Sequence, residues 1–367
     1  MKLLVLNTDE KEFSYGGVCP FMRNMHPYLE EEFELSYMTL PRSWSSIRLG
    51  WLERLGWLER LGGIEIRIPG STRMKYLMYL WLHRRALKKV DFILSHGPEG
   101  SYVASFSGVP YAHIYHGNSN PMSISRFKIG KYFAKMYDRM FERIDKTASL
   151  VYTVGPARND KQKKLFNPLK QDVKPQDIDK RSGFVFAGRL ESMKNVDRLI
   201  NIYSKLPDDV KSVNPFYIAG YGTQEKALKE EVRRIEGLGE SGAAGRVVFL
   251  GKVDNTKMLE TDADKKILLM ASSTEGMPTA IAEAFSVGLP VVSTAVGDIP
   301  SVVKNGVNGY LLPLDFKDED YIDAIVKIMN NYESFAKAAY ESSVLFNREK
   351  ITRGVIGDIL SFLDKKQ

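Results

Sequence analysis

The sequence predicts an α/β protein built from two doubly wound, Rossmann-like domains. Short apolar segments that end in polar residues or glycine alternate with helical patterns, which indicates parallel sheets covered by helices on both faces. The alternation occurs twice, on either side of a polar segment, Pro168–Gly183, that is rich in lysine, glutamine and aspartate. A length of 367 residues also suits two domains.

The first half begins with a glycine-ended loop between a strand and a helix. Lys2–Thr8 is an apolar strand, residues 9–17 form a polar loop that ends in Gly16 and Gly17, and Val18–Glu32 has a helical pattern. Further strands are expected at Glu34–Leu40, Asp91–His96 and Tyr111–Gly117.

The second half repeats the alternation more clearly, with helical patterns at Val196–Leu206 and Gln224–Ile235. Its expected strands are Phe184–Leu190, Phe216–Gly220, Val247–Gly251, Lys266–Ser272 and Val291–Ala295. We predict an N-terminal domain over residues 1–168 and a C-terminal domain over 169–349. A last helix, about 350–367, is expected to pack back on the first domain. In such sheets, ligands bind outside the carboxyl ends of the strands.

Composition is that of an ordinary globular protein, with 44% hydrophobic and 26% charged residues. The chain has no apolar run of about 18 residues, so a membrane span is not expected. Its start has neither the apolar length nor the cleavage site of a signal peptide. The only cysteine is Cys19, which excludes an intrachain disulfide and fits a reducing cytoplasm.

Charge is distributed unevenly between the halves. Residues 1–168 hold 25 Lys and Arg against 16 Asp and Glu, a net charge of +9, whereas the remainder holds 27 against 29. The first half is therefore expected to meet an anionic partner, such as phospholipid headgroups, lipid-linked phosphates or nucleic acid.

Two segments of the first half have both a membrane interpretation and a structural one. Leu49–Arg54 is repeated at once as Leu55–Arg60, and each copy carries Trp, Leu and Arg. Such residues suit a membrane interface, although a duplicated surface insertion explains them as well. Met74–Lys89 is an apolar helix with a basic end; it fits a membrane surface or a core helix whose cations complement its C-terminal dipole.

The most informative stretch of the chain is Ser273–Phe285, in which Glu275 and Glu283 lie eight residues apart. A buried strand precedes Glu275, and Pro278 is expected to open the helix that contains Glu283. Free N–H groups at a helix N-terminus make a seat for a phosphate. Two carboxylates beside such a seat can accept hydrogen bonds from sugar hydroxyls, a combination that a nucleotide sugar presents.

A second group of residues supplies positive charge at another strand end. Gly188 closes a predicted strand, and Arg189 and Lys194 follow it before the next helix. Two cations there can neutralise a diphosphate without a metal, since arginine offers a bidentate fork and lysine a point charge.

Taken together, these motifs closely resemble the retaining GT-B glycosyltransferases of family 4, the glycosyl transferases group 1. The match covers about residues 183–313 and includes Gly288–Val292 and Asn305–Leu312 in the family's order and spacing. The first half matches more loosely, through Gly16-Gly17, His116-Gly117 and Asn167-Pro168.

The resemblance implies a role for each matching residue. Arg189 and Lys194 would bind the donor diphosphate, Glu283 the ribose hydroxyls and Glu275 the transferred sugar. His116 would lie near the sugar and the attacking oxygen. The other implied donor-binding residues are Gly16, Gly17, Gly188, Val253 near the base, Gly276, Met277, Pro278 and Thr279.

The implied reaction is transfer from a nucleoside diphosphate sugar, with UDP favoured, to a hydroxyl of a glycan or lipid-linked acceptor. Retention of configuration, no metal, no cofactor and a role in bacterial surface polysaccharide synthesis are expected. The basic first half predicts a cytoplasmic protein that sits peripherally on the inner face of the plasma membrane. Asp262-Ala263-Asp264 looks like the metal-binding motif of another glycosyltransferase fold, but a solvated turn is the favoured interpretation.

Departures from the family pattern are few. Where relatives often have Gly-Gly-x-x-Glu, this chain has Gly297-Asp298-Ile299-Pro300-Ser301. Two rival functions stay open: another GT-B enzyme, either a nucleotide-sugar epimerase or a phosphorylase, and a nucleic-acid-binding protein that uses the basic half. No nucleic-acid-binding motif supports the second, so no nucleic acid partner is expected.

Overall fold

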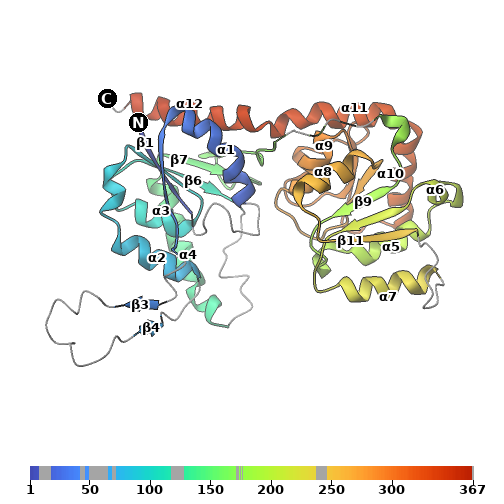
Figure 1. Cartoon of the computed structure of the whole chain (residues 1–367), viewed down its shortest axis with the longest axis horizontal. Helices are drawn as coiled ribbons and strands as arrows, with labels where there is room; N and C mark the ends of the chain where they lie inside the picture. The colour runs from blue at the N-terminus through green and yellow to red at the C-terminus, as the bar shows by residue number, and fades with distance from the viewer. Residues whose placement is uncertain are drawn as a thin grey trace. The chain divides into compact units, whose positions relative to one another are not determined.

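The computed structural model divides into two compact units, Met1–Leu165 with Glu349–Gln367, and Phe166–Arg348 (Figure 1). It describes residues 1–7, 18–41, 46–48, 65–67, 72–116, 128–170, 173, 175, 177–236 and 246–365. Gly16, Gly17, Gly117 and the duplicated segment from Leu49 to Arg60 lie outside the described residues.

The N-terminal unit is built on a six-stranded parallel sheet with the order β2-β1-β5-β6-β7-β8. A separate antiparallel pair, β3 and β4, joins Ser46–Arg48 to Glu65–Arg67. The sheet strands are β1 (Lys2–Leu6), β2 (Glu34–Met38), β5 (Phe92–Ser95), β6 (Tyr111–Tyr115), β7 (Leu150–Thr153) and β8 (Gln162–Lys164). β1, β5 and β6 are almost wholly apolar because both faces of the sheet are covered.

Helices cover the sheet of the N-terminal unit in two groups. One group contains α2 (Thr72–Leu82), α3 (Pro98–Ala104) and α4 (Lys128–Thr147), which pack in sequence against one another. The other contains α1 (Val18–Glu32) and the last helix, α12 (Arg348–Asp364), joined by an ion pair of 3.0 Å between Glu31 and Arg353. The Tyr152 hydroxyl also donates to Asp358, which ties α12 to β7.

The C-terminal unit has a second six-stranded parallel sheet, with the order β11-β10-β9-β12-β13-β14. Its strands are β9 (Phe184–Ala187), β10 (Phe216–Ala219), β11 (Val247–Gly251), β12 (Ile267–Leu269), β13 (Val291–Thr294) and β14 (Gly309–Leu312). This is the 3-2-1-4-5-6 strand order of Rossmann folds. All strands are parallel, and the order in which they follow one another along the sheet reverses between β9 and β12. The predicted fold class, two doubly wound α/β domains, is therefore confirmed.

Two helix groups cover this second sheet. The helices α8 (Asn255–Ala263), α9 (Thr279–Ser286) and α11 (Tyr332–Ser342) pack together, as do α5 (Val196–Ser204), α7 (Glu225–Glu236) and α10 (Asp318–Asn330); α6 spans Asp208–Val213. Phe184, Phe186 and Phe216 are fully buried between the sheet and α5. α9 is buried along nearly all its length, which fixes the position of the predicted phosphate seat.

Candidate active site

The carboxyl end of β9 comes unusually close to the neighbouring strand β10. Gly220 has a φ of +153°, and a Cβ there would lie 1.8 Å from the carbonyl oxygen of Gly188. Only glycine permits this approach. Arg189 comes directly after Gly188 and is exposed. Its guanidinium forms no ion pair or hydrogen bond with another described residue. It is therefore an available cation at the strand end.

Lys194 is the second predicted cation, and it closes the short 3-10 turn η5 (Ser192–Lys194). The next residue, Asn195, adopts the left-handed conformation with a φ of 48°, and its side chain donates to the Ala271 carbonyl at 2.8 Å. This contact holds the turn after β9 against the end of β12. The backbone N–H of Ser273 adds a bond of 2.8 Å to the Met193 carbonyl.

These contacts bring Lys194 and Glu275 together. The Nζ of Lys194 lies 2.5 Å from Oε1 of Glu275, and both side chains are largely buried. Ser272 donates to the same carboxylate oxygen at 2.7 Å. The pair stands where the strand order reverses, between the carboxyl ends of β9 and β12, which is where ligands bind in such sheets.

A glycine in the following loop supports the position of Glu275. Gly297 has a φ of +59°, and a Cβ there would lie 2.2 Å from the Glu275 carbonyl oxygen. The N–H of Asp298 donates to the Gly276 carbonyl at 2.9 Å. The stretch in which this chain departs from the family pattern thus supports the backbone of the Glu275 loop.

The N-terminus of α9 is open toward solvent. The helix begins at Thr279, so Pro278 is the N-cap residue and not the first helical residue; with a ψ of 129° its backbone is still extended. Proline cannot cap the first N–H groups with a side chain, and Gly276 and Thr279 are exposed beside them. Met277 is buried, and its carbonyl accepts a hydrogen bond of 3.1 Å from Asn167. The helix end can therefore receive an anion.

Glu283 lies on α9 in a different environment from Glu275. It is only 7% exposed, and its carboxyl group makes no hydrogen bond or ion pair with another described residue. Desolvation raises its pKa to about 7. A buried carboxylate without donors is costly, so hydroxyl groups of a ligand would stabilise its charged form.

Asp262, on the neighbouring helix α8, is also completely buried. Burial, together with the charge of Glu283, raises the pKa of Asp262. The expectation of a solvated turn at Asp262 is therefore wrong: α8 packs against α9 and encloses the side chain. No group of three or more His, Cys, Asp or Glu within the described ranges is placed to hold a metal ion.

Val253, predicted to lie near the base of the nucleotide, follows β11 and is half-buried. It precedes Asp254, whose side chain caps α8 by accepting from the Lys257 N–H at 3.0 Å. Tyr221, in the turn after β10, is exposed, with the ammonium of Lys252 5.5 Å from its ring centre.

His116 belongs to the N-terminal unit and follows β6 directly. Its Nε2 lies 2.9 Å from Nδ1 of His96, the two rings stack, and the edge of Phe21 packs against both. Burial lowers the pKa of His116 to about 4, so this imidazole is neutral at pH 7. The other predicted donor residues of this unit, Gly16 and Gly17, are not among the described residues.

In the C-terminal unit the two strand-end cations, the carboxylates and the N-terminus of α9 lie where the strand order reverses, the place at which doubly wound sheets bind their ligands. Whole-chain comparison agrees with the fold: the crystal structure of Anabaena Alr3699/HepE in complex with UDP superposes with a TM-score of 0.68 at 18% identity, covering 98% of this chain and 100% of that one. The chain therefore has the GT-B fold.

Residues 170–342, which make up most of the C-terminal unit, match the family model of the glycosyl transferases group 1. A D-inositol 3-phosphate glycosyltransferase of Nocardioides is 27% identical over 181 residues, 46% of this chain and 39% of that protein. A Campylobacter jejuni GalNAc-alpha-(1->4)-GalNAc-alpha-(1->3)-diNAcBac-PP-undecaprenol alpha-1,4-N-acetyl-D-galactosaminyltransferase is 28% identical over 161 residues, 44% of this chain and 42% of it. The matches span about two fifths of the length of these curated relatives.

Sequence reasoning missed Ser272, Asp262 and His96 as neighbours of the predicted residues. Ser272 and His96 each end a predicted strand, which is a signal that could have been followed. Asp262 gave no such signal, because only the packing of α8 on α9 brings it near Glu283.

Proposed function

We propose that this protein is a glycosyltransferase that moves a sugar from a UDP-sugar to a hydroxyl of a glycan or lipid-linked acceptor. The observation that carries the proposal is the contact between Lys194 and Glu275 at the point where the strand order reverses, beside the uncapped end of α9. Opposite charges there suit a diphosphate and the hydroxyls of a sugar.

In this proposal the cations and the helix end bind the leaving group. As the bond between the sugar carbon and the diphosphate breaks, negative charge grows on the phosphate oxygens, and Arg189, Lys194 and the N–H groups of α9 stabilise it. No metal is needed for that stabilisation. Glu283 holds the ribose hydroxyls, and Val253 lies near the base.

The transfer proceeds with retention of configuration in the family that the sequence resembles. The acceptor oxygen attacks from the face that the diphosphate leaves, and the departing phosphate oxygen takes the acceptor proton. No side chain of this chain acts as a nucleophile in that scheme. His116, neutral at pH 7, is proposed to lie near the sugar and the acceptor oxygen.

The acceptor is proposed to be a lipid-linked oligosaccharide of a bacterial surface polysaccharide, approached at the inner face of the plasma membrane. The C. jejuni relative is named for an undecaprenol-linked acceptor, which supports this class. The net charge of +9 over residues 1–168 supports an anionic surface as partner. No helix of the described ranges is long and apolar enough to cross a bilayer.

A two-stage experiment tests the proposal. A thermal-shift screen of UDP-, GDP- and ADP-sugars comes first, since a ligand at 100 times its dissociation constant adds about 2.7 kcal/mol of stability. Product analysis with the best donor follows. A new glycoside with release of UDP supports the proposal, whereas an epimer or a sugar phosphate identifies one of the rival enzymes. A salt-sensitive shift of nucleic acid without any nucleotide-sugar binding would refute it.

A further inference from the structure

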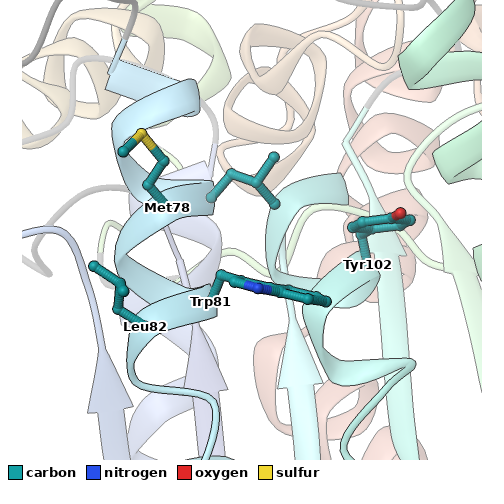
Figure 2. Close-up of a pocket in the computed structure, with 5 residues that line it drawn as sticks. Met78, Trp81, Leu82 and Tyr102 are labelled. Carbon is teal, nitrogen blue, oxygen red and sulfur yellow. The ribbon is translucent and has the colours of Figure 1, made fainter.

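The N-terminal unit carries an apolar pocket on α2 and α3 that the proposed chemistry does not use. The pocket has a volume of about 370 Å³ and is lined by Leu77, Met78, Trp81, Leu82 and Tyr102 (Figure 2). Four of these side chains come from α2. The fifth, Tyr102, comes from α3.

The surroundings of the pocket are unusually exposed for apolar residues. Met78, Trp81 and Leu82 are 41%, 42% and 63% exposed, and Phe106 beside them is 45% exposed. Among the described residues of the N-terminal unit, Met1 is the only other large hydrophobic side chain exposed to this degree. Single exposed apolar residues are ordinary, but a contiguous group marks an interaction surface. We call Leu77, Met78, Trp81, Leu82, Tyr102 and Phe106 the apolar patch.

Aromatic contacts hold the apolar patch in shape. The ring of Phe106 meets Trp81 edge to face at 5.5 Å and Tyr102 at 5.2 Å. Three rings from α2, α3 and the turn after α3 therefore support one another. Such a preformed surface loses little side-chain entropy when it is covered.

Two arginines contact the rings of the apolar patch, and further cations follow α2 in the sequence. The guanidinium of Arg84 lies 5.4 Å from the Trp81 ring centre, and that of Arg143 lies 3.8 Å from the Phe106 ring centre. Arg85, Lys88 and Lys89 follow α2, are exposed and have no acidic partner among the described residues. Tryptophan and leucine beside arginine and lysine match the interfacial layer of a bilayer, where rings sit at headgroup depth and cations meet phosphates.

We propose that the apolar patch docks the N-terminal unit on a bilayer of anionic phospholipids, with one hydrocarbon chain seated in the pocket. Charge complementarity selects this occupant, since Arg84 and Arg143 contact the rings of an apolar surface that has no acidic residue in its lining. Docking on a membrane would bring the enzyme to a lipid-linked acceptor, so the purpose of the docking rests on the proposed function. This docking also assigns Met74–Lys89 to a membrane-facing role, one of the two interpretations of that helix.

Vesicle flotation tests the docking. The full chain is expected to bind vesicles of equal parts phosphatidylglycerol and phosphatidylcholine, and to bind pure phosphatidylcholine much more weakly. Trp81→Gln and Leu82→Gln should each weaken binding by about tenfold or more, because buried apolar area is lost. Arg85→Gln should weaken it by about fivefold, and only on the anionic vesicles. Leu314→Gln, which changes a 54% exposed leucine in the C-terminal unit, should have no effect.

A fluorescence experiment tests whether a hydrocarbon chain of the lipid occupies the pocket. A variant with Trp44→Phe, Trp51→Phe and Trp57→Phe keeps Trp81 as its single tryptophan. Phospholipids brominated on their acyl chains should quench its emission. If that triple variant does not fold, the quenching lost on Trp81→Phe in the otherwise unchanged chain gives the same information.

Three results would overturn the inference: unchanged flotation of both Gln variants of the patch, equal binding to neutral vesicles, or binding that requires an isoprenoid phosphate in the vesicle. Failure of membrane docking can be told apart from failure of the proposed function by measuring the thermal shift that a UDP-sugar causes in the same variants without vesicles. Loss of nucleotide binding with intact flotation would refute the transferase proposal alone.

Discussion

Lys194 and Glu275 stand 81 positions apart in the chain, yet their charged groups meet at 2.5 Å at the carboxyl ends of β9 and β12. The contact gives Lys194 a structural role beside the role that we propose for it in binding the donor. Lys194 neutralises a largely buried carboxylate, and in the proposed function it also binds a phosphate of the donor.

Replacing Lys194 with alanine should reduce the rate of transfer by about 10²–10³, since one donor to the developing charge is lost. It should also lower the free energy of unfolding by about 1–3 kcal/mol, because Glu275 keeps its burial and loses its partner. Single-turnover kinetics and urea unfolding measure the two effects. Lys327→Ala removes an exposed pair with Asp323 and should leave both quantities unchanged. Full activity of Lys194→Ala would refute the site.

The pKa of Glu283 predicts how stability depends on pH. Burial raises this pKa from 4.5 to about 7, so the folded chain keeps a proton that the unfolded chain releases. The free energy of unfolding should therefore fall as pH rises from about 4.5 to about 7, by about 3 kcal/mol at most. Glu283→Gln should remove this contribution and be more stable than the wild type at pH 8. Asp262, whose own pKa is raised partly by Glu283, should titrate at a lower pH in that variant.

The same group should make donor binding depend on pH. Hydroxyl groups donate more strongly to a carboxylate than to a carboxylic acid, so affinity for the UDP-sugar should rise as pH increases through about 7. Calorimetry at pH 6 and pH 8 measures the change. Glu283→Ala should bind the donor weakly at both values. Glu230→Gln, an exposed change on α7, serves as the control, and a similar pH dependence in Glu283→Gln would show that another group titrates.

Gly297→Ala should disturb Glu275 without touching a charged group. The new Cβ would meet the Glu275 carbonyl at 2.2 Å in a backbone conformation with a φ of +59°, so the loop must move. We expect a loss of about 1–3 kcal/mol and reduced transfer. In Gly357→Ala the new methyl meets open space on α12, and the helix should gain about 0.5–1 kcal/mol. Differential scanning calorimetry compares the two, and equal melting temperatures would contradict this account.

Arg181 should be essential to the stability of α9. Its buried guanidinium donates to the carbonyls of Val287 and Gly288 at 2.7 and 2.9 Å, which satisfies the C-terminal end of the helix that carries Glu283. Arg181→Met leaves those carbonyls buried without donors, and the expected loss is about 2–4 kcal/mol. Arg234→Met, which breaks an exposed pair with Glu231, should cost little. An equal effect of the two substitutions on the urea midpoint would show that Arg181 has no special role.

Apolar strands were the most predictable part of the fold. The expected strand Val247–Gly251 coincides with β11. Among the helices, the expected helix Val18–Glu32 coincides with α1. The strands β3, β4, β7, β8 and β14 were not predicted. β8 consists of Gln162-Lys163-Lys164, which has no apolar pattern, and it pairs with β7 at the edge of the sheet.

The parts of the site were predictable singly, but their relations were not. Motifs placed Lys194 and Glu275 at strand ends, whereas their direct pairing depends on Asn195, which fastens η5 to Ala271. The burial of Glu283 likewise depends on the packing of α8 against α9. Such contacts arise from tertiary packing, and a local sequence pattern does not predict them.

The chain enters and leaves the C-terminal unit at one place. Leu169 and Asn347 pair as a parallel bridge, and the rings of Phe166 and Phe346 meet at 5.5 Å close by. Residues 166–348 are thus a cassette inserted into the other unit, with both of its junctions side by side. A cassette of this kind can be exchanged between relatives, or permuted at this junction, by cutting the chain at two neighbouring points and leaving every strand of both six-stranded sheets intact.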